Sequence, residues 1–181
     1  MLREILDTTA ERVGKDLKDQ PGVEAELRRT IGVVYFALGQ YEKAEAMHRE
    51  ALRLRKSLFG ETNAFVADSL NDLADAIQAR GEIAKAEVMY REALALRKRL
   101  LGDAHPDVAT SLHGLALVLY DQRKLAEAET MNRQALALRR KLRGNSHLEV
   151  ASSLNSLALV LRSLKKSAEA ESLYREALAM R

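Results

Sequence analysis

The stretch SLHGLALVLYDQRKLAEAETMNRQALALRR, residues 111–140, decides the fold of this chain. It holds two helical patterns joined by a short polar segment, and similar stretches stand one unit before it and one unit after it. The string REALRLRK of residues 49–56 returns in the same register as REALALRK at 91–98, RQALALRR at 133–140 and REALAMR at 175–181. The strings begin 42 residues apart. A 42-residue repeat with two helices per unit predicts a stack of helical hairpins rather than a globule with one central core.

The apolar spacing along the whole chain predicts an all-α protein of nine helices. We expect them at about 2–17, 23–38, 41–58, 64–79, 83–101, 106–122, 125–142, 148–164 and 168–181. The first helix should stop at Gln20, Pro21 and Gly22, because proline cannot continue the hydrogen-bond ladder. After this leading helix, the others form pairs in which helix A is followed by helix B.

The connections between pairs carry consistent end signals. Glycine stands where a left-handed residue would end each helix B, at Gly60, Gly102 and Gly144. The N-cap position of the next helix A is held by Asn63, His105 and His147, and Pro106 follows at a first helical position. The tight turn from A to B uses Gly39 and Gly81, which Arg123 and Lys165 replace further along. We expect a less relaxed left-handed residue there, or another form of turn.

Composition points away from several classes of protein. The net charge is only +3, with 29 basic residues interleaved among 26 acidic ones, so no nucleic-acid partner is expected. The longest apolar runs fall far below the ~20 residues of a membrane span, and the charged N-terminus does not resemble a secretory signal. The lack of cysteine suits a reducing cytosol. We therefore expect a soluble cytoplasmic protein.

No pattern indicates catalysis, a metal or a cofactor. The four histidines, His48, His105, His113 and His147, form no HExxH motif and have no acidic partner at metal-ligand spacing. Ser111 and His113 are two residues apart on a helix and point in different directions, so they cannot act as nucleophile and base. We read the Glu–Arg pairs at i, i+4, such as Glu45 with Arg49, as support for the helices themselves.

The spacing of Leu73, Ala74, Ile77, Ala86, Tyr90 and Ala93, and its return in the following unit, resembles a tetratricopeptide repeat. The length of the unit and the sequence HPDVA at 105–109 resemble the kinesin light chain subclass. The resemblance implies one domain over residues 1–181, a right-handed α-solenoid. It consists of a leading helix in 1–20 and repeats at 23–62, 63–104, 105–146 and 147–181, the last possibly truncated.

The N-terminal third is also similar to the stretch that opens repeat arrays attached to bacterial serine/threonine protein kinases. The chain itself has no Gly-rich phosphate loop, HRD-type loop or DFG motif, so this likeness implies a repeat module without kinase activity. A regulatory segment of a larger signalling kinase is therefore one alternative for its function.

The family resemblance implies that the A helices line a concave groove that binds a protein or peptide. The residues expected to bind the peptide are Arg29, Asn71, His113, Leu117, Tyr120, Asn155, Leu159 and Arg162. Arginine and asparagine donate to the carbonyls of an extended peptide, and the apolar members receive its side chains. The alternative for the polar row is that these residues bond within or between A helices or face solvent.

The C-terminal end leaves a second alternative open. Apolar Leu173, Ala177, Leu178 and Met180 form a stripe on the last helix that no later helix in the sequence covers. Repeat arrays need a polar outer face at their ends. The stripe therefore indicates that the chain continues or that this helix meets another molecule, including a second copy of the chain.

Overall fold

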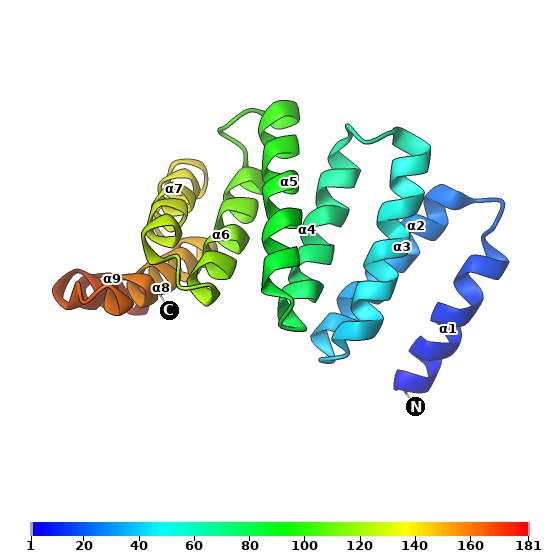
Figure 1. The fold of residues 1–181 in the computed structure, drawn as a ribbon, viewed down its shortest axis with the longest axis horizontal. Helices are drawn as coiled ribbons and strands as arrows, with labels where there is room; N and C mark the ends of the chain where they lie inside the picture. Colours follow the sequence, from blue (N-terminus) through cyan, green and yellow to red (C-terminus); the bar gives the residue numbers. More distant parts are fainter. Residues whose placement is uncertain (1, 181) are drawn as a thin grey trace. The chain divides into compact units, whose positions relative to one another are not determined.

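The computed structural model describes residues 2–180, except for the side chain of Leu2, and every regular element in that range is an α-helix (Figure 1). The helices are α1 (Leu2–Asp16), α2 (Pro21–Ala37), α3 (Tyr41–Phe59), α4 (Ala64–Ala79), α5 (Ile83–Leu101), α6 (Pro106–Asp121), α7 (Leu125–Arg143), α8 (Leu148–Ser163) and α9 (Ser167–Ala179). The predicted all-α fold is confirmed. The predicted end of the last helix at Arg181 lies outside the described residues.

Two helices begin earlier than predicted, α9 by one residue and α2 by two. Helix α2 begins at Pro21, whereas the sequence reading placed Pro21 and Gly22 in the preceding break and started the helix at residue 23. Proline occupies the first helical position here, where its missing N–H has no intrahelical acceptor to lose.

The predicted helix caps are confirmed. The side chain of Asn63 accepts a hydrogen bond from the backbone N–H of Phe65 at 2.9 Å. Nδ1 of His105 and of His147 accepts in the same way at 3.2 Å, from the second residue of the helix that follows. Each cap satisfies one of the N–H groups that a helix start leaves without an intrahelical partner.

From α2 onward, each turn between consecutive helices contains a left-handed residue. Gly60, which ends α3, has φ of 75°. In the A-to-B turns, Gly39 and Gly81 have φ of 72° and 82°, and their replacements Arg123 and Lys165 keep φ of 63° and 62°. A side chain at positive φ is strained, so the first of the two predicted forms, a less relaxed left-handed residue, is confirmed.

The chain forms two compact units, Met1–Leu96 and Arg97–Arg181, and α5 contributes residues to both. In the first unit α3 packs against α2 and α4, and these two A helices also touch. In the second unit α7 packs against α6 and α8 in the same way, and α9 packs on α8. Each unit therefore has adjacent A helices backed by a B helix. A single domain over residues 1–181 stays a prediction.

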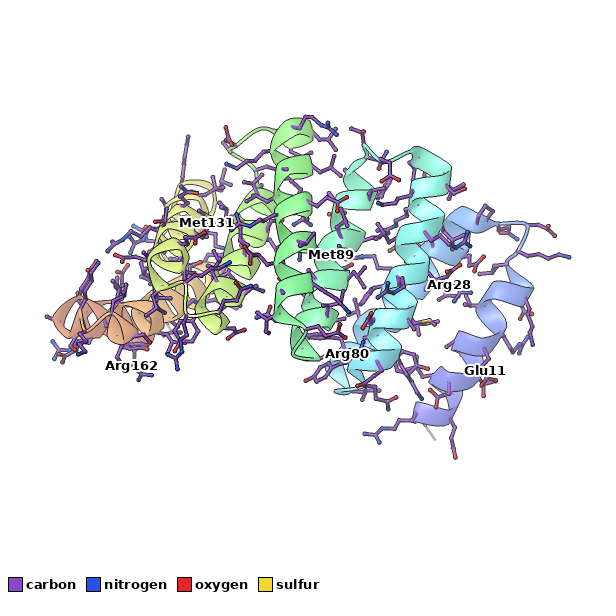
Figure 2. All side chains as sticks on the ribbon, viewed as in Figure 1. Glu11, Arg28, Arg80, Met89, Met131 and Arg162 are labelled. Atoms are coloured by element: carbon purple, nitrogen blue, oxygen red, sulfur yellow. The ribbon has the colours of Figure 1, made fainter. Side chains whose placement is uncertain are left out.

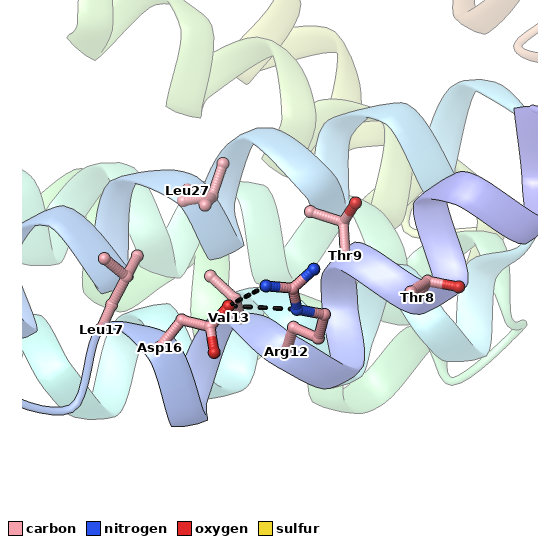
Figure 3. Close-up of a pocket in the computed structure, with 7 residues that line it drawn as sticks. All are labelled: Thr8, Thr9, Arg12, Val13, Asp16, Leu17 and Leu27. Carbon is pink, nitrogen blue, oxygen red and sulfur yellow. Dashed lines mark hydrogen bonds and ion pairs between the residues drawn. The ribbon is translucent and has the colours of Figure 1, made fainter.

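Helix α1 covers part of the first pair, as expected of a leading helix. Val13 is buried, and Asp7 accepts hydrogen bonds from Tyr35 and Lys43, each at 2.6 Å. A hollow of about 280 Å³ remains between α1 and α2, with the Arg12–Asp16 ion pair at its edge (Figure 3).

The apolar stripe predicted to be uncovered on the last helix is mostly covered. Ala177 is buried, and Leu173 and Met180 pack against the core that α8 contributes. Leu178 alone of the four predicted residues is highly exposed, at 70%. Helix α8, the partner within the same pair, buries Ala177 and contacts Leu173 and Met180, which stay half-buried. A contact of this helix with another molecule stays a prediction.

Candidate peptide-binding surface

The predicted binding residues all lie on A helices, but they differ in exposure. Arg162, near the end of α8, is exposed (Figure 2). Asn71 on α4 is buried, with 6% of its surface exposed. The remaining six are half-buried: Arg29, His113, Leu117, Tyr120, Asn155 and Leu159.

In the first unit the polar row has partners within the protein. Arg29 on α2 donates through Nε to Asp72 on α4 at 2.6 Å. Partial burial lowers the pKa of Arg29, but the nearby Asp72 carboxylate outweighs it, so the pKa is raised. Asn71 donates to Asp75, one turn along the same helix, at 3.4 Å. Bonding between and within A helices therefore occurs here, and peptide binding by these two residues stays a prediction.

In the second unit several buried polar atoms at this level lack hydrogen-bond partners among the described residues. Nδ1 of His113 is buried without a hydrogen-bond partner among the described residues, as are both amide atoms of Asn132 on α7. Burial lowers the pKa of His113 to about 4, the charge of Arg139 lowers it further, and Asn132 acts in the opposite direction. His113 is therefore neutral at pH 7 and can donate or accept a hydrogen bond.

The last member of the row, Asn155, lines a hollow of about 230 Å³ with Tyr174, Ala177 and Leu178. The hollow lies between α8 and α9. Asn155 is thus half-buried beside the final B helix and remains reachable from solvent.

The apolar members of the predicted site lie on α6 and α8 of the second unit. Leu117 and Leu159 are both half-buried. Tyr120 links the two helices, since its hydroxyl oxygen accepts a hydrogen bond from Ser163 at 3.3 Å. Half-exposed apolar side chains therefore stand beside half-exposed polar ones on adjacent A helices.

A buried arginine in each of three B helices escaped the sequence reading. Arg55, Arg97 and Arg139 are each at least nine-tenths buried. Nη1 of each donates to the backbone carbonyl ten residues later and to the serine hydroxyl fourteen residues later. These acceptors are Phe65 and Ser69, Asp107 and Ser111, and Glu149 and Ser153. The arginines fasten each B helix to the next A helix, and the recurring Arg–Ser spacing was the available signal.

Two other sequence expectations can be compared with the structure. All four Glu–Arg pairs at i, i+4 form ion pairs within their own helices. Among the described residues, no group of three or more His, Cys, Asp or Glu side chains could hold a metal ion. None of the described helices is long and apolar enough to cross a membrane.

The family model for the tetratricopeptide repeat matches residues 23–99, 65–141 and 107–181. The chain belongs to the tetratricopeptide repeat family. Successive matches begin 42 residues apart and overlap, so the family pattern runs from residue 23 to residue 181 in one register. Members of this family generally act as scaffolds for protein–protein interaction.

Solved structures give the same fold for this tetratricopeptide repeat chain. BtubC (BKLC) from P. vanneervenii matches with a TM-score of 0.82 at 23% identity, over 99% of this chain and 71% of that one. A Podosopora anserina protein described as a kinesin light chain with nearly identical TPR-like repeats matches with 0.73 at 19%, over 99% and 88%. The apo form of RapI matches with 0.79 at 15%, over 98% and 49%. No curated protein matches the sequence.

Proposed function

We propose that this tetratricopeptide repeat chain is a binding scaffold that holds an extended peptide of a partner protein on the face of its A helices. The observation that carries the proposal is the mixed face of α6 and α8, where apolar Leu117 and Leu159 stand beside polar His113 and Asn155. An extended peptide offers both apolar side chains and unpaired backbone groups, and it needs both kinds of partner once water is displaced.

The proposal assigns a role to each kind of residue. Asn155 and His113 form hydrogen bonds with the peptide backbone. The apolar side chains of the peptide contact Leu117, Leu159 and Tyr120. Exposed Arg162 contacts the peptide at the edge of this face. We propose a binding role without catalysis, in the cytoplasm. Self-association through α9 has less support, because Ala177 is buried and Leu173 and Met180 are packed against the core.

The test is to select peptides from a random heptapeptide display library on the wild-type protein and to measure their affinities for variants. Leu117→Ser with Leu159→Ser should weaken the selected peptides by about tenfold or more, because central apolar contacts carry most binding energy. Leu148→Ser, at a residue 75% exposed at the start of α8, is the matched control and should change nothing. Equal affinities for wild type and the double variant would show that this face does not bind the selected peptides.

A further inference from the structure

Helix α1 precedes α2 as each B helix precedes the next A helix, but it lacks the hydrogen bonds that fasten those B helices. Val13 of α1 takes the position of Arg55, and Leu27 of α2 takes the position of Ser69. An apolar pair therefore replaces the arginine and serine, and it lines the hollow of about 280 Å³ between α1 and α2 (Figure 3). A second hollow of about 280 Å³ separates α1 from α3 beside Lys43. Helix α1 is thus held less closely than the B helices that follow it.

The surface of α2 beneath α1 is charged where every later A helix is apolar. Glu24 and Arg28 form an ion pair on α2 at 2.7 Å, and Glu24 is buried. The later A helices have a buried valine and leucine at these two positions: Val66 with Leu70, Val108 with Leu112, and Val150 with Leu154. Valine and leucine lose their burial when a covering helix leaves, whereas an ion pair regains its hydration. The surface under α1 is therefore better suited to being uncovered than the same surface of a later repeat.

Helix α1 matches this surface at two points. Gly14 lies against Arg28, because a Cβ at Gly14 would overlap Nη2 of that arginine. Two helical turns earlier, the Asp7 carboxylate accepts hydrogen bonds from Tyr35 and Lys43, each at 2.6 Å. The surface thus fits an amphipathic helix that has a carboxylate and, two turns later, a glycine.

The B helices α3, α5 and α7 do not meet these two requirements. At the position of Gly14 they carry a long cation, which would collide with Arg28: Lys56, Lys98 and Arg140. At the position of Asp7 they carry a residue with the same charge as Lys43: Arg49, Arg91 and Arg133. Like charges placed together repel. The segment of this chain that fits the surface is therefore α1 itself.

We propose that the surface of α2 and α3 beneath α1 is an exchangeable helix-binding site, and that the α1 segment of a second copy of this chain binds there in place of the protein's own α1. The exchange replaces each contact with an identical one, so its main cost is the opening of the connection at residues 17–20. This site is independent of the peptide binding proposed for α6 and α8.

The first experiment shortens that connection. Deletion of residues 18–20 prevents α1 from folding back onto its own α2, but leaves it able to reach a second copy. The deletion variant should be a dimer in analytical ultracentrifugation at micromolar concentration, where the wild type should be mainly a monomer. Gly14→Leu in the deletion variant should abolish the dimer, because leucine overlaps Arg28. Lys15→Leu, the same change at the exposed neighbouring residue, is the matched control and should leave the dimer intact.

The second experiment keeps the connection and adds α1 as a labelled peptide of residues 1–20, with binding followed by fluorescence anisotropy. In the wild-type protein the tethered α1 competes with the peptide. Gly14→Leu in the protein displaces the tethered α1, so the wild-type peptide should bind at least about tenfold more tightly than to the wild-type protein. A peptide with Lys15→Leu should bind equally well, and peptides with Gly14→Leu or Asp7→Lys should not bind.

Three results would overturn the proposal. A folded deletion variant that stays monomeric at every concentration rules out the exchange. A dimer that survives Gly14→Leu has its contact elsewhere. If the deletion variant loses its helical circular dichroism, the peptide titration decides, and equal peptide affinities for the wild-type and Gly14→Leu proteins would show that the site does not exist. Tight binding of the Asp7→Lys peptide would show a general affinity for apolar helices instead of recognition of α1.

Discussion

Arg55 in the first unit and Arg139 in the second occupy equivalent positions, but only Arg55 has a carboxylate partner. Both arginines fasten a B helix to the next A helix through one terminal nitrogen. In the first unit Glu26 takes the other terminal nitrogen, and in the second unit no described residue does. A repeat can thus keep the hydrogen bonds that join its B helix to the next A helix without the ion pair that accompanies them in the first unit.

A second difference lies at the contact between helices A and B. His48 on α3 fills the space beside Gly32 on α2, whereas the corresponding pair in the second unit is Asn132 with Ala116. The larger imidazole requires the smaller glycine. The first unit is therefore tightly filled at this level, and the second keeps an amide whose polar atoms lack partners among the described residues.

The largest expected effect concerns pH and His113. Its pKa is about 4 in the folded protein against 6.5 for the free side chain, so the unfolded chain binds the proton more readily. Stability is complete above pH 6.5 and falls as the pH drops toward 4, by about 2–3 kcal/mol between pH 7 and 4.5. Urea unfolding at both pH values measures it.

His113→Asn is the matched control, because asparagine occupies the same position in the repeats before and after it. It should remove most of the loss that His113 causes and leave the contribution of His48, whose pKa burial also lowers. An unchanged pH dependence in His113→Asn would show that His113 does not cause the loss.

A smaller effect is expected at Gly32. An added Cβ would lie 2.6 Å from Cε1 of His48, a ring that is only 2% exposed and has no room to retreat. Gly32→Ala should therefore cost about 2 kcal/mol of the free energy of unfolding. His48→Asn, which reproduces the pair of the second unit, should remove most of that cost in the double variant.

The same substitution at Gly22 provides the control, because nothing lies within 4 Å of a Cβ there. Gly22→Ala should be neutral or slightly stabilising. A cost at Gly32 that persists unchanged in the His48→Asn background would mean that the histidine is not what requires glycine.

Arg55→Met should lower the free energy of unfolding by about 1 kcal/mol more than Arg139→Met does. Arg55→Met loses the ion pair with Glu26 as well as the hydrogen bonds to the next A helix. Arg139→Met loses only those hydrogen bonds, and it also removes an unpaired buried charge. The difference is modest because the Glu26 side chain is 59% exposed and its charge is screened. Equal destabilisation in urea would show that Glu26 contributes nothing to stability. Glu26→Gln measures that contribution directly.

The helices could be predicted from the sequence because their signals are local. Apolar spacing set their number, and Asn63 and His105 marked helix starts through side chains that reach only two residues along the chain. The start of α2 was predicted two residues too late, because a proline such as Pro21 can end one helix or begin the next.

The candidate site could be predicted only in outline, because it depends on which side chains meet across helices. The family pattern placed Asn71 on an A helix, but its burial follows from neighbours that the pattern does not show. Arg139 stands in a string of charges that reads as a solvated surface. Its burial follows from the hydrogen bond to Ser153, fourteen residues away, and the recurrence of this Arg–Ser spacing was the only sign of it in the sequence.

The smallest effect is expected at the A-to-B turns, where the first unit has Gly81 and the second has Lys165 in the same left-handed conformation. Lys165→Gly should raise the free energy of unfolding by about 0.5–1 kcal/mol, since glycine reaches positive φ without a steric penalty. Gly81→Lys should lower it by about 1 kcal/mol for the same reason, although space for a Cβ is open there. Lys165→Ala keeps the Cβ and removes the charge, so it should leave stability unchanged. If the alanine variant gained as much as the glycine variant, the charge of Lys165, rather than its backbone conformation, would be the source of the difference between the two turns.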